Sequence, residues 1–245
     1  MYFDQSNFDI RCEWGKQGVL QLAETSDLYI LVDVLSFSTC VEIGTNRGAT
    51  VFPYQWRDET AKDFAQVMDA ELAEKRGMGR YSLSPASLLQ VSSGTRLVLP
   101  SPNGATLSLA TGTVPTLAGC LRNCRAVASA AMQYGHSITV VPAGERWLDG
   151  SLRPAFEDLI GAGAIIAHLQ GRLSPEARAA VAAYQSVQSN VSGSIRNCSS
   201  GRELIEKGFE QDVELATEIN VSDCVPKLIN NAYIRESSYH LGHVD

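Results

Sequence analysis

The stretch that decides the fold, residues 28–44, reads LYILVDVLSFSTCVEIG. It opens with a run of apolar residues, which is typical of a strand buried on both faces. Asp33 interrupts this run, although a buried carboxylate costs several kcal/mol unless it is paired or bound to a metal. Residues 37–48 are expected to form a short helix that ends at Gly48. The stretch therefore predicts a strand, an acidic junction and a helix.

The same alternation of strand and helix continues along the chain. Further strands are predicted at residues 49–54, 95–101, 113–121 and 137–144, and helices at 58–77, 103–112, 123–135, 153–171 and 174–187, with two more before Pro226. Asp58 and Ser174 are expected to cap the helices that follow them. Alternation of this kind indicates an α/β fold with a mostly parallel sheet covered by helices.

Composition excludes several classes of protein. The chain has 245 residues and a formal charge of −7, and its 20 Lys and Arg residues are scattered, which argues against a nucleic-acid-binding surface. No run of 18 apolar residues and no signal-peptide pattern is present, so we expect no membrane partner and a cytoplasmic location. The six cysteines are spread along the chain and are expected to be reduced and to be mostly small core residues.

Four junctions between a predicted strand and the next helix carry small or hydrogen-bonding residues. In parallel sheets, ligands bind outside the carboxyl ends of the strands, where helix N-termini present free N–H groups to anions. We therefore expect the four junctions to form one site. Residues there that either cap a helix or turn, or bind an anion, are Ser36, Ser38, Thr39, Ser101, Asn103, Gly104 and Asn123. Arg122 either binds a phosphate through its guanidinium or is a surface charge.

The acidic residues at these junctions allow two interpretations each. Asp33 either caps the following turn or acts in metal binding or catalysis. Glu157 and Asp158 either serve the dipole of the apolar helix that they begin or act at a site for an oxygen-ligated cation. Asp212 either lies at a solvated helix start or also acts at such a cation site. No phosphate-binding loop of the Walker type and no G-x-S-x-G motif is present.

An ordered set of short motifs resembles a known family. The motifs are DVLSFST at 33–39, PNGATL at 102–107, GCLRNCRAVA at 119–128, PAG at 142–144 with FEDLIGAGAII at 156–166, and QDVELA at 211–216. Their order and spacing are similar to those of the 2-phosphosulfolactate phosphatase family, the magnesium-dependent enzymes of coenzyme M biosynthesis. The resemblance extends from about Asp33 to Pro226.

This resemblance implies a two-lobed α/β fold, for which we place the lobes at residues 1–120 and 121–245. It also implies Mg²⁺-dependent hydrolysis of a small anionic phosphate ester, 2-phosphosulfolactate, to 3-sulfolactate and phosphate, while assembly into a homo-oligomer stays open. The family's shared polar positions correspond to Asp33, Asn103, Gly104, Asn123, Gly144, Glu157, Asp158 and Asp212. We assign catalysis to Asp33, Glu157 and Asp158, and metal binding to Asp33, Asp158 and Asp212.

The chain departs from the family pattern at one position that bears on the substrate. Ser36 stands where the family typically has Arg, a side chain suited to a phosphate or a sulfonate. The long segment ERWLDGSLRP introduces Arg146 and Arg153, which could replace that charge in substrate binding. Two further hypotheses follow, namely a phosphatase with a non-sulfonated substrate and an anion-binding protein without catalysis.

Overall fold

The computed structural model of the protein describes residues 3–236. The strands are β1 (Ile10–Cys12), β2 (Leu28–Val32), β3 (Thr50–Tyr54), β4 (Glu71–Leu72), β5 (Arg96–Pro100), β6 (Thr116–Gly119), β7 (Ile138–Pro142), β8 (Glu145–Arg146), β9 (Leu152–Arg153), β10 (Pro226–Ile229) and β11 (Ala232–Arg235). The helices are α1 (Gly15–Leu22), α2 (Phe37–Asn46), α3 (Glu59–Val67), α4 (Pro85–Leu88), α5 (Gly104–Ala110), α6 (Cys124–Ala131), α7 (Phe156–Ile166), α8 (Pro175–Val187), α9 (Val191–Asn197), α10 (Ser199–Glu206) and α11 (Glu210–Ala216).

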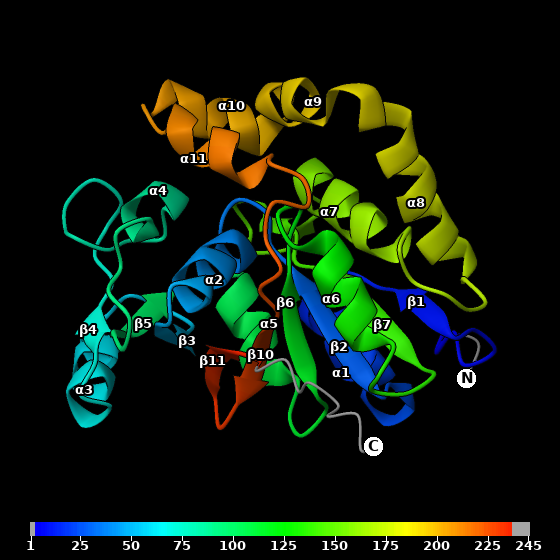
Figure 1. Cartoon of the computed structure of the whole chain (residues 1–245), viewed down its shortest axis with the longest axis horizontal. Helices are drawn as coiled ribbons and strands as arrows, with labels where there is room; N and C mark the ends of the chain where they lie inside the picture. Colours follow the sequence, from blue (N-terminus) through cyan, green and yellow to red (C-terminus); the bar gives the residue numbers. More distant parts are fainter. Residues whose placement is uncertain (1–2, 237–245) are drawn as a thin grey trace, which may run out of the picture.

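Nine of the described strands form one large sheet, in the order β1-β7-β2-β6-β10-β11-β3-β5-β4. It consists of two parallel blocks, β1-β7-β2-β6 and β3-β5-β4, joined by the antiparallel hairpin β10–β11 (Figure 1). The hairpin pairs with β6 through Lys227 and Leu117, and with β3 through Tyr233 and Val51. The predicted α/β fold with a mostly parallel sheet covered by helices is confirmed.

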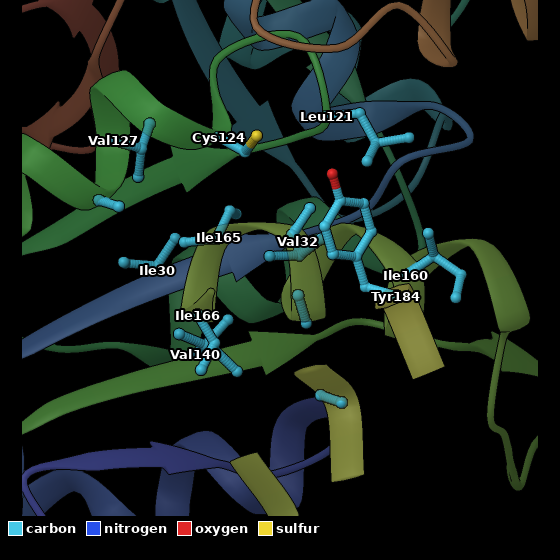
Figure 2. Packing of buried hydrophobic residues seen from close by; sticks show 14 of the residues in the cluster. Ile30, Val32, Leu121, Cys124, Val127, Val140, Ile160, Ile165, Ile166 and Tyr184 are labelled. Atoms are coloured by element: carbon cyan, nitrogen blue, oxygen red, sulfur yellow. The ribbon is translucent and has the colours of Figure 1, made fainter. Parts of the chain in front are cut away.

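The larger of the two blocks is covered on both faces. Leu28, Ile30 and Val32 of β2 point toward α6, α7 and α8, and Figure 2 shows Ile30 and Val32 in this densely packed apolar core. Tyr29 and Leu31, which alternate with them, point to the opposite face and pack against α1 and α5. Because both faces are buried, β2 is apolar throughout rather than alternating between apolar and polar residues.

The smaller block is covered by α2 on one face and α3 on the other. Phe37 and Val41 of α2 pack against Val51 of β3 and against Tyr233 of the hairpin. Phe52 of β3 points the other way and packs with residues of α3. Helix α2 thus lies over the line where the two blocks meet, and it begins next to Asp33.

One predicted helix is shorter in the structure, and one hairpin of the main sheet was missed. The helix expected at 58–77 is α3, which begins after its Asp58 cap but ends at Val67, because Asp69 has a φ of 46° and the short strand β4 follows. The hairpin β10–β11 was not predicted. The lobe boundary between residues 120 and 121 stays a prediction, and strands from both sides of it lie in the same sheet.

The structure also bears on the membrane and cysteine predictions. Across residues 3–236, no helix combines the length and the apolar character that crossing a membrane requires. All six cysteines are free thiols, and five of them are buried. The prediction that the cysteines are mostly core residues is confirmed, with Cys198 half-buried, and their reduced state stays a prediction.

Candidate functional site

Asp33 lies at the end of β2 with its carboxylate shared between two helix starts. Oδ1 accepts a hydrogen bond from the Phe37 N–H of α2 (3.0 Å), and Oδ2 accepts one from the Gly104 N–H of α5 (2.9 Å). Only 7% of the residue is exposed. Burial, and then the charge of Glu157, raises the pKa of the Asp33 carboxyl to about 6. The capping interpretation of Asp33 is therefore confirmed. It is compatible with the other interpretation, metal binding or catalysis.

Asp158 connects the first and last junctions in the same way. Its Oδ1 accepts from the Val34 N–H (2.8 Å) and its Oδ2 from the Gly144 N–H (2.9 Å), so the side chain of α7 bridges the ends of β2 and β7. Burial, and then the charges of Asp33 and Glu157, raises the pKa of Asp158 well above its usual range. Two acids with raised pKa values thus lie at one edge of the sheet.

Glu145 and Glu157 complete a group that we call the carboxylate cluster, made of Asp33, Glu145, Glu157 and Asp158. Burial, and then the charges of Asp33 and Glu157, raises the pKa of Glu145 to about 7. Its Oε2 accepts from Asn103 Nδ2 at 2.9 Å. Glu157 is 2% exposed, and its Oε2 accepts from the thiol of Cys198 at 3.2 Å. A cluster of this kind favours binding of a cation or a proton.

Gly104 is required by the closeness of α5 to Asp33. A Cβ atom at this position would lie 2.3 Å from the ring of Phe37 and 2.7 Å from Asp33 Oδ2. Only glycine allows the α5 backbone to donate its N–H to the carboxylate. Ser38 and Thr39 serve the same junction, because their hydroxyls donate to the carbonyls of residues 33 and 34 (both 2.8 Å).

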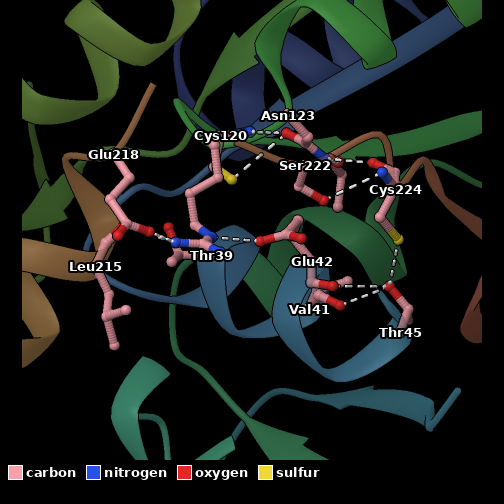
Figure 3. Close-up of polar contacts among 12 residues, drawn as sticks. Thr39, Val41, Glu42, Thr45, Cys120, Asn123, Leu215, Glu218, Ser222 and Cys224 are labelled. Carbon is pink, nitrogen blue, oxygen red and sulfur yellow. Dashed lines mark hydrogen bonds and ion pairs between the residues drawn. The ribbon is translucent and has the colours of Figure 1, made fainter. Parts of the chain in front are cut away.

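The polar side chains of the third junction have their partners outside the carboxylate cluster. Arg122 forms ion pairs with Glu42 (2.6 Å) and with Glu218, in the network that Figure 3 shows around Glu42. Asn123 is fully buried, and its amide donates to the Cys224 carbonyl (3.0 Å) while its Oδ1 accepts from the N–H of residue 120 (2.9 Å). Phosphate binding by Arg122 and Asn123 stays a prediction that these contacts do not support.

A separate arginine lies beside the unusual Ser36. The guanidinium of Arg76 donates to Ser36 Oγ at 3.2 Å, pairs with Asp212 and donates to the Leu83 carbonyl. Asp212 also accepts from the Ser84 hydroxyl (2.6 Å) and from the N–H of residue 86 (3.0 Å). Its carboxylate therefore fixes Arg76, and its predicted role as a metal ligand stays a prediction.

The remaining predicted ligands surround the cluster. Arg153 donates to the Ser200 hydroxyl of α10 (3.2 Å). Its positive charge also partly offsets the rise in the pKa of Glu145. Arg146 donates to two backbone carbonyls on the β8–β9 hairpin and the β5–α5 turn. Ser101 is buried at the end of β5, where its N–H donates to the Tyr54 carbonyl (2.9 Å), and its predicted role is untested.

Sequence reasoning missed Glu145 as a member of the site. The residue follows the PAG motif directly, so its position after the strand end was a usable signal. Arg76 lies in the irregular segment between α3 and α4, which carries no periodicity that would predict its partner. Within residues 3–236, no group of three or more His, Cys, Asp or Glu side chains is placed so that it could hold a metal ion.

Comparison with known proteins gives one consistent description. The family model described as 2-phosphosulpholactate phosphatase matches residues 16–231. The 2-phosphosulfolactate phosphatase of Methanothermobacter thermautotrophicus is 34% identical over 205 residues, which cover 83% of this chain and 87% of that protein. The probable 2-phosphosulfolactate phosphatase of Carboxydothermus hydrogenoformans is 28% identical over 81% of this chain and 84% of its own length. The probable enzyme of Thermotoga maritima is 26% identical over 84% and 90%.

Proposed function

The chain belongs to the 2-phosphosulpholactate phosphatase family, and from this premise we propose that it hydrolyses a small anionic phosphate monoester. The proposed substrate is 2-phosphosulfolactate, and the products are 3-sulfolactate and inorganic phosphate. The observation that carries the proposal is the carboxylate cluster, which gathers acids from the β2, β7 and α7 segments at one edge of the sheet. The acids of the cluster lie near enough to repel one another, which suits them to proton transfer, and Asp33 and Asp158 are the pair that would hold a divalent cation.

Asp33 and Asp158 fit the Mg²⁺ ion that the family resemblance implies. Each of their oxygens accepts one backbone N–H, which leaves a second lone pair on each oxygen for a ligand. A divalent cation would offset the repulsion and burial that raise the pKa of both carboxyls. Two carboxylates are enough, because Mg²⁺ in enzymes usually keeps water and phosphate oxygens as its other ligands. When bound, the ion would neutralise charge on the phosphoryl oxygens.

The other two acids of the cluster are suited to move protons. Glu157 takes a proton from the water that attacks phosphorus, as a new P–O bond forms. Glu145 holds a proton up to about pH 7, and it donates this proton to the ester oxygen as the P–O bond to the leaving group breaks. Arg153, beside Glu145, supplies positive charge for the phosphoryl oxygens. Products are the free hydroxy acid and inorganic phosphate.

Phosphate release from synthetic 2-phosphosulfolactate tests the proposal. We expect turnover that requires Mg²⁺, stops with EDTA and returns when Mg²⁺ is added in excess. Asp33→Asn and Glu157→Gln are each expected to reduce kcat by roughly 100-fold or more, since they remove a ligand or a base from the site. Asp63→Asn on the exposed face of α3 is the matched control and is expected to retain activity.

A wider panel of phosphate esters decides among the remaining hypotheses. Release of phosphate only from esters without a sulfonate would replace the proposed substrate with a non-sulfonated one. Binding of phosphate and sulfonates with no turnover of any ester would show an anion-binding protein without catalysis. Full Mg²⁺-dependent turnover by Asp33→Asn would remove Asp33 from the metal site.

A further inference from the structure

A cavity of about 360 Å³ opens beside the carboxylate cluster, between α1 and the β8–β9 hairpin. The residues that define its character are Trp14, Lys16, Asn103, Glu145, Arg146 and Leu152. The volume is in the range of pockets that hold small molecules. Sequence reasoning singled out neither Lys16 nor this cavity.

The inner end of the cavity adjoins the residues that hold the proposed metal ligands. Asn103 precedes Gly104, whose N–H binds Asp33, and it donates directly to Glu145. Ala143, which also lines the cavity, precedes Gly144, whose N–H binds Asp158. A ligand bound at the cluster would therefore extend into this cavity.

The wall of the cavity also carries two cations, Lys16 and Arg146, that form no ion pair with any described residue. None of the ion pairs among residues 3–236 includes Lys16 or Arg146, whereas Arg76 and Arg122 are each paired with carboxylates. Unpaired cations on the wall of a cavity favour an anionic ligand.

Arg146 is also held in place before any ligand binds. Its guanidinium donates to the carbonyls of Gly150 (3.3 Å) and Pro102 (3.2 Å), and it lies 6.0 Å from the centroid of the Trp56 ring. These partners come from the hairpin, the β5–α5 turn and the segment after β3. None of them is charged, so the guanidinium keeps its full charge in a fixed position, which lowers the entropic cost of binding an anion.

We propose that this cavity binds the second acidic group of the substrate, with Lys16 and Arg146 as its cationic partners. The proposal rests on the proposed function: the phosphoryl group lies at the carboxylate cluster, and the sulfonate of the same small molecule reaches the outer cations. Lys16 and Arg146 are then specificity-determining residues, which distinguish esters that carry a remote acid from those that do not.

Binding of the product tests this inference without turnover. Calorimetric titration of the protein with 3-sulfolactate, and with lactate as the analogue that lacks the sulfonate, is carried out in Mg²⁺. We expect Lys16→Gln and Arg146→Gln each to weaken binding of 3-sulfolactate by about tenfold, and to change binding of lactate much less. The double variant Lys62→Gln, Arg178→Gln removes two exposed charges elsewhere, and it is expected to bind both ligands as the unchanged protein does.

Kinetic measurements separate this inference from the proposed function. For Lys16→Gln and Arg146→Gln, the ratio of kcat/KM for 2-phosphosulfolactate to that for phenyl phosphate is expected to fall about tenfold. An unchanged ratio, equal weakening of 3-sulfolactate and lactate, or no binding of 3-sulfolactate would overturn the inference even in an active phosphatase. If no ester is hydrolysed but 3-sulfolactate still binds through both cations, the proposed function fails and the cavity assignment stands.

Discussion

Glu145 shows how the site changes the chemistry of a single residue. The carboxyl is half-buried, accepts from Asn103, and lies near the acids Asp33 and Glu157 as well as the cation Arg153. The net effect is a pKa of about 7, compared with an ordinary value of 4.5. The folded protein therefore holds a proton on Glu145 in a pH range where the unfolded chain has lost it.

The stability of the protein is expected to reflect this proton. Because the folded state binds more protons between about pH 4.5 and 7, the contribution of Glu145 to stability is present at low pH and is lost as the pH rises through 7. Glu145→Gln, which cannot ionise, is expected to gain on the order of 1–2 kcal/mol relative to the unchanged protein at pH 8, and little at pH 5.

Urea unfolding at the two pH values measures the difference. Glu59→Gln, on an exposed side chain of α3, is the matched control and should show no such dependence. Equal effects of Glu145→Gln at pH 5 and pH 8 would contradict the raised pKa.

Gly104 is a residue at which a single methyl group is expected to disturb the candidate site. In Gly104→Ala, the new methyl overlaps Phe37 and Asp33, so the start of α5 must move away from the carboxylate. We expect a loss of about 1–3 kcal/mol in the free energy of unfolding. Phosphate release should fall as well, because Asp33 loses its bond to Gly104. Thermal unfolding and the release assay measure both effects, and an unchanged Tm would contradict the geometry.

At the scale of elements, α2 is tied to the C-terminal segments by a buried ion pair. Glu42 is fully buried, and its Oε2 accepts from Arg122 Nε, while Oε1 has no hydrogen-bond partner among the described residues. Arg122 also donates to the Leu215 carbonyl of α11 (3.2 Å). One guanidinium therefore joins three parts of the chain.

Arg122→Gln is expected to destabilise the protein by about 3–5 kcal/mol, because Glu42 is left as an uncompensated buried charge. Adding Glu42→Gln to that variant should recover a large part of the loss. Chemical denaturation of the two single variants and the double variant gives the coupling energy. If the double variant is as unstable as the sum of the two single variants, the ion pair does not carry the effect.

Elements with a strong local signal could be predicted from the sequence. The apolar run at residues 28–32 predicts β2, and the cap at Ser174 predicts α8. The structure contains both elements. Helix α3 is shorter than predicted, because the backbone of Asp69 takes a left-handed conformation that residue patterning does not indicate. The hairpin β10–β11 was missed because its pairing with β6 and β3 depends on contacts distant in sequence.

The same limit applies to the candidate site. Asp33, Gly104 and Asp158 come together because strand ends and helix starts share an edge, which the βα pattern implies. The direction of the Arg122 side chain could not be predicted in this way, because its partner Glu42 lies on α2, which is distant in the sequence. Local pattern locates the edge of the sheet, while side-chain pairing across distant segments decides which residues face it.

At the scale of the whole molecule, the order of strands predicts a single cooperative unit. Strand β7 lies between β1 and β2, and the β10–β11 hairpin lies between β6 and β3. Fragments 1–120 and 121–245, expressed separately, are therefore expected to lack cooperative unfolding, because each exposes unpaired strands of the other. Circular dichroism and urea titration of each fragment test this. A fragment that unfolds with a sharp transition of its own would instead support the lobe boundary at 120.

Because the hairpin at the centre of the sheet is made last, the sheet can be completed only late in biosynthesis. Ribosomes add roughly 5–20 residues per second, so both parallel blocks emerge well before residues 226–235 are made. Until then, the inner edges of β6 and β3 have no strand to pair with, and such edges are prone to join those of other chains. During this period the unpaired edges of β6 and β3 are a defined surface that a chaperone can shield. The period ends when the β10–β11 hairpin pairs with both edges.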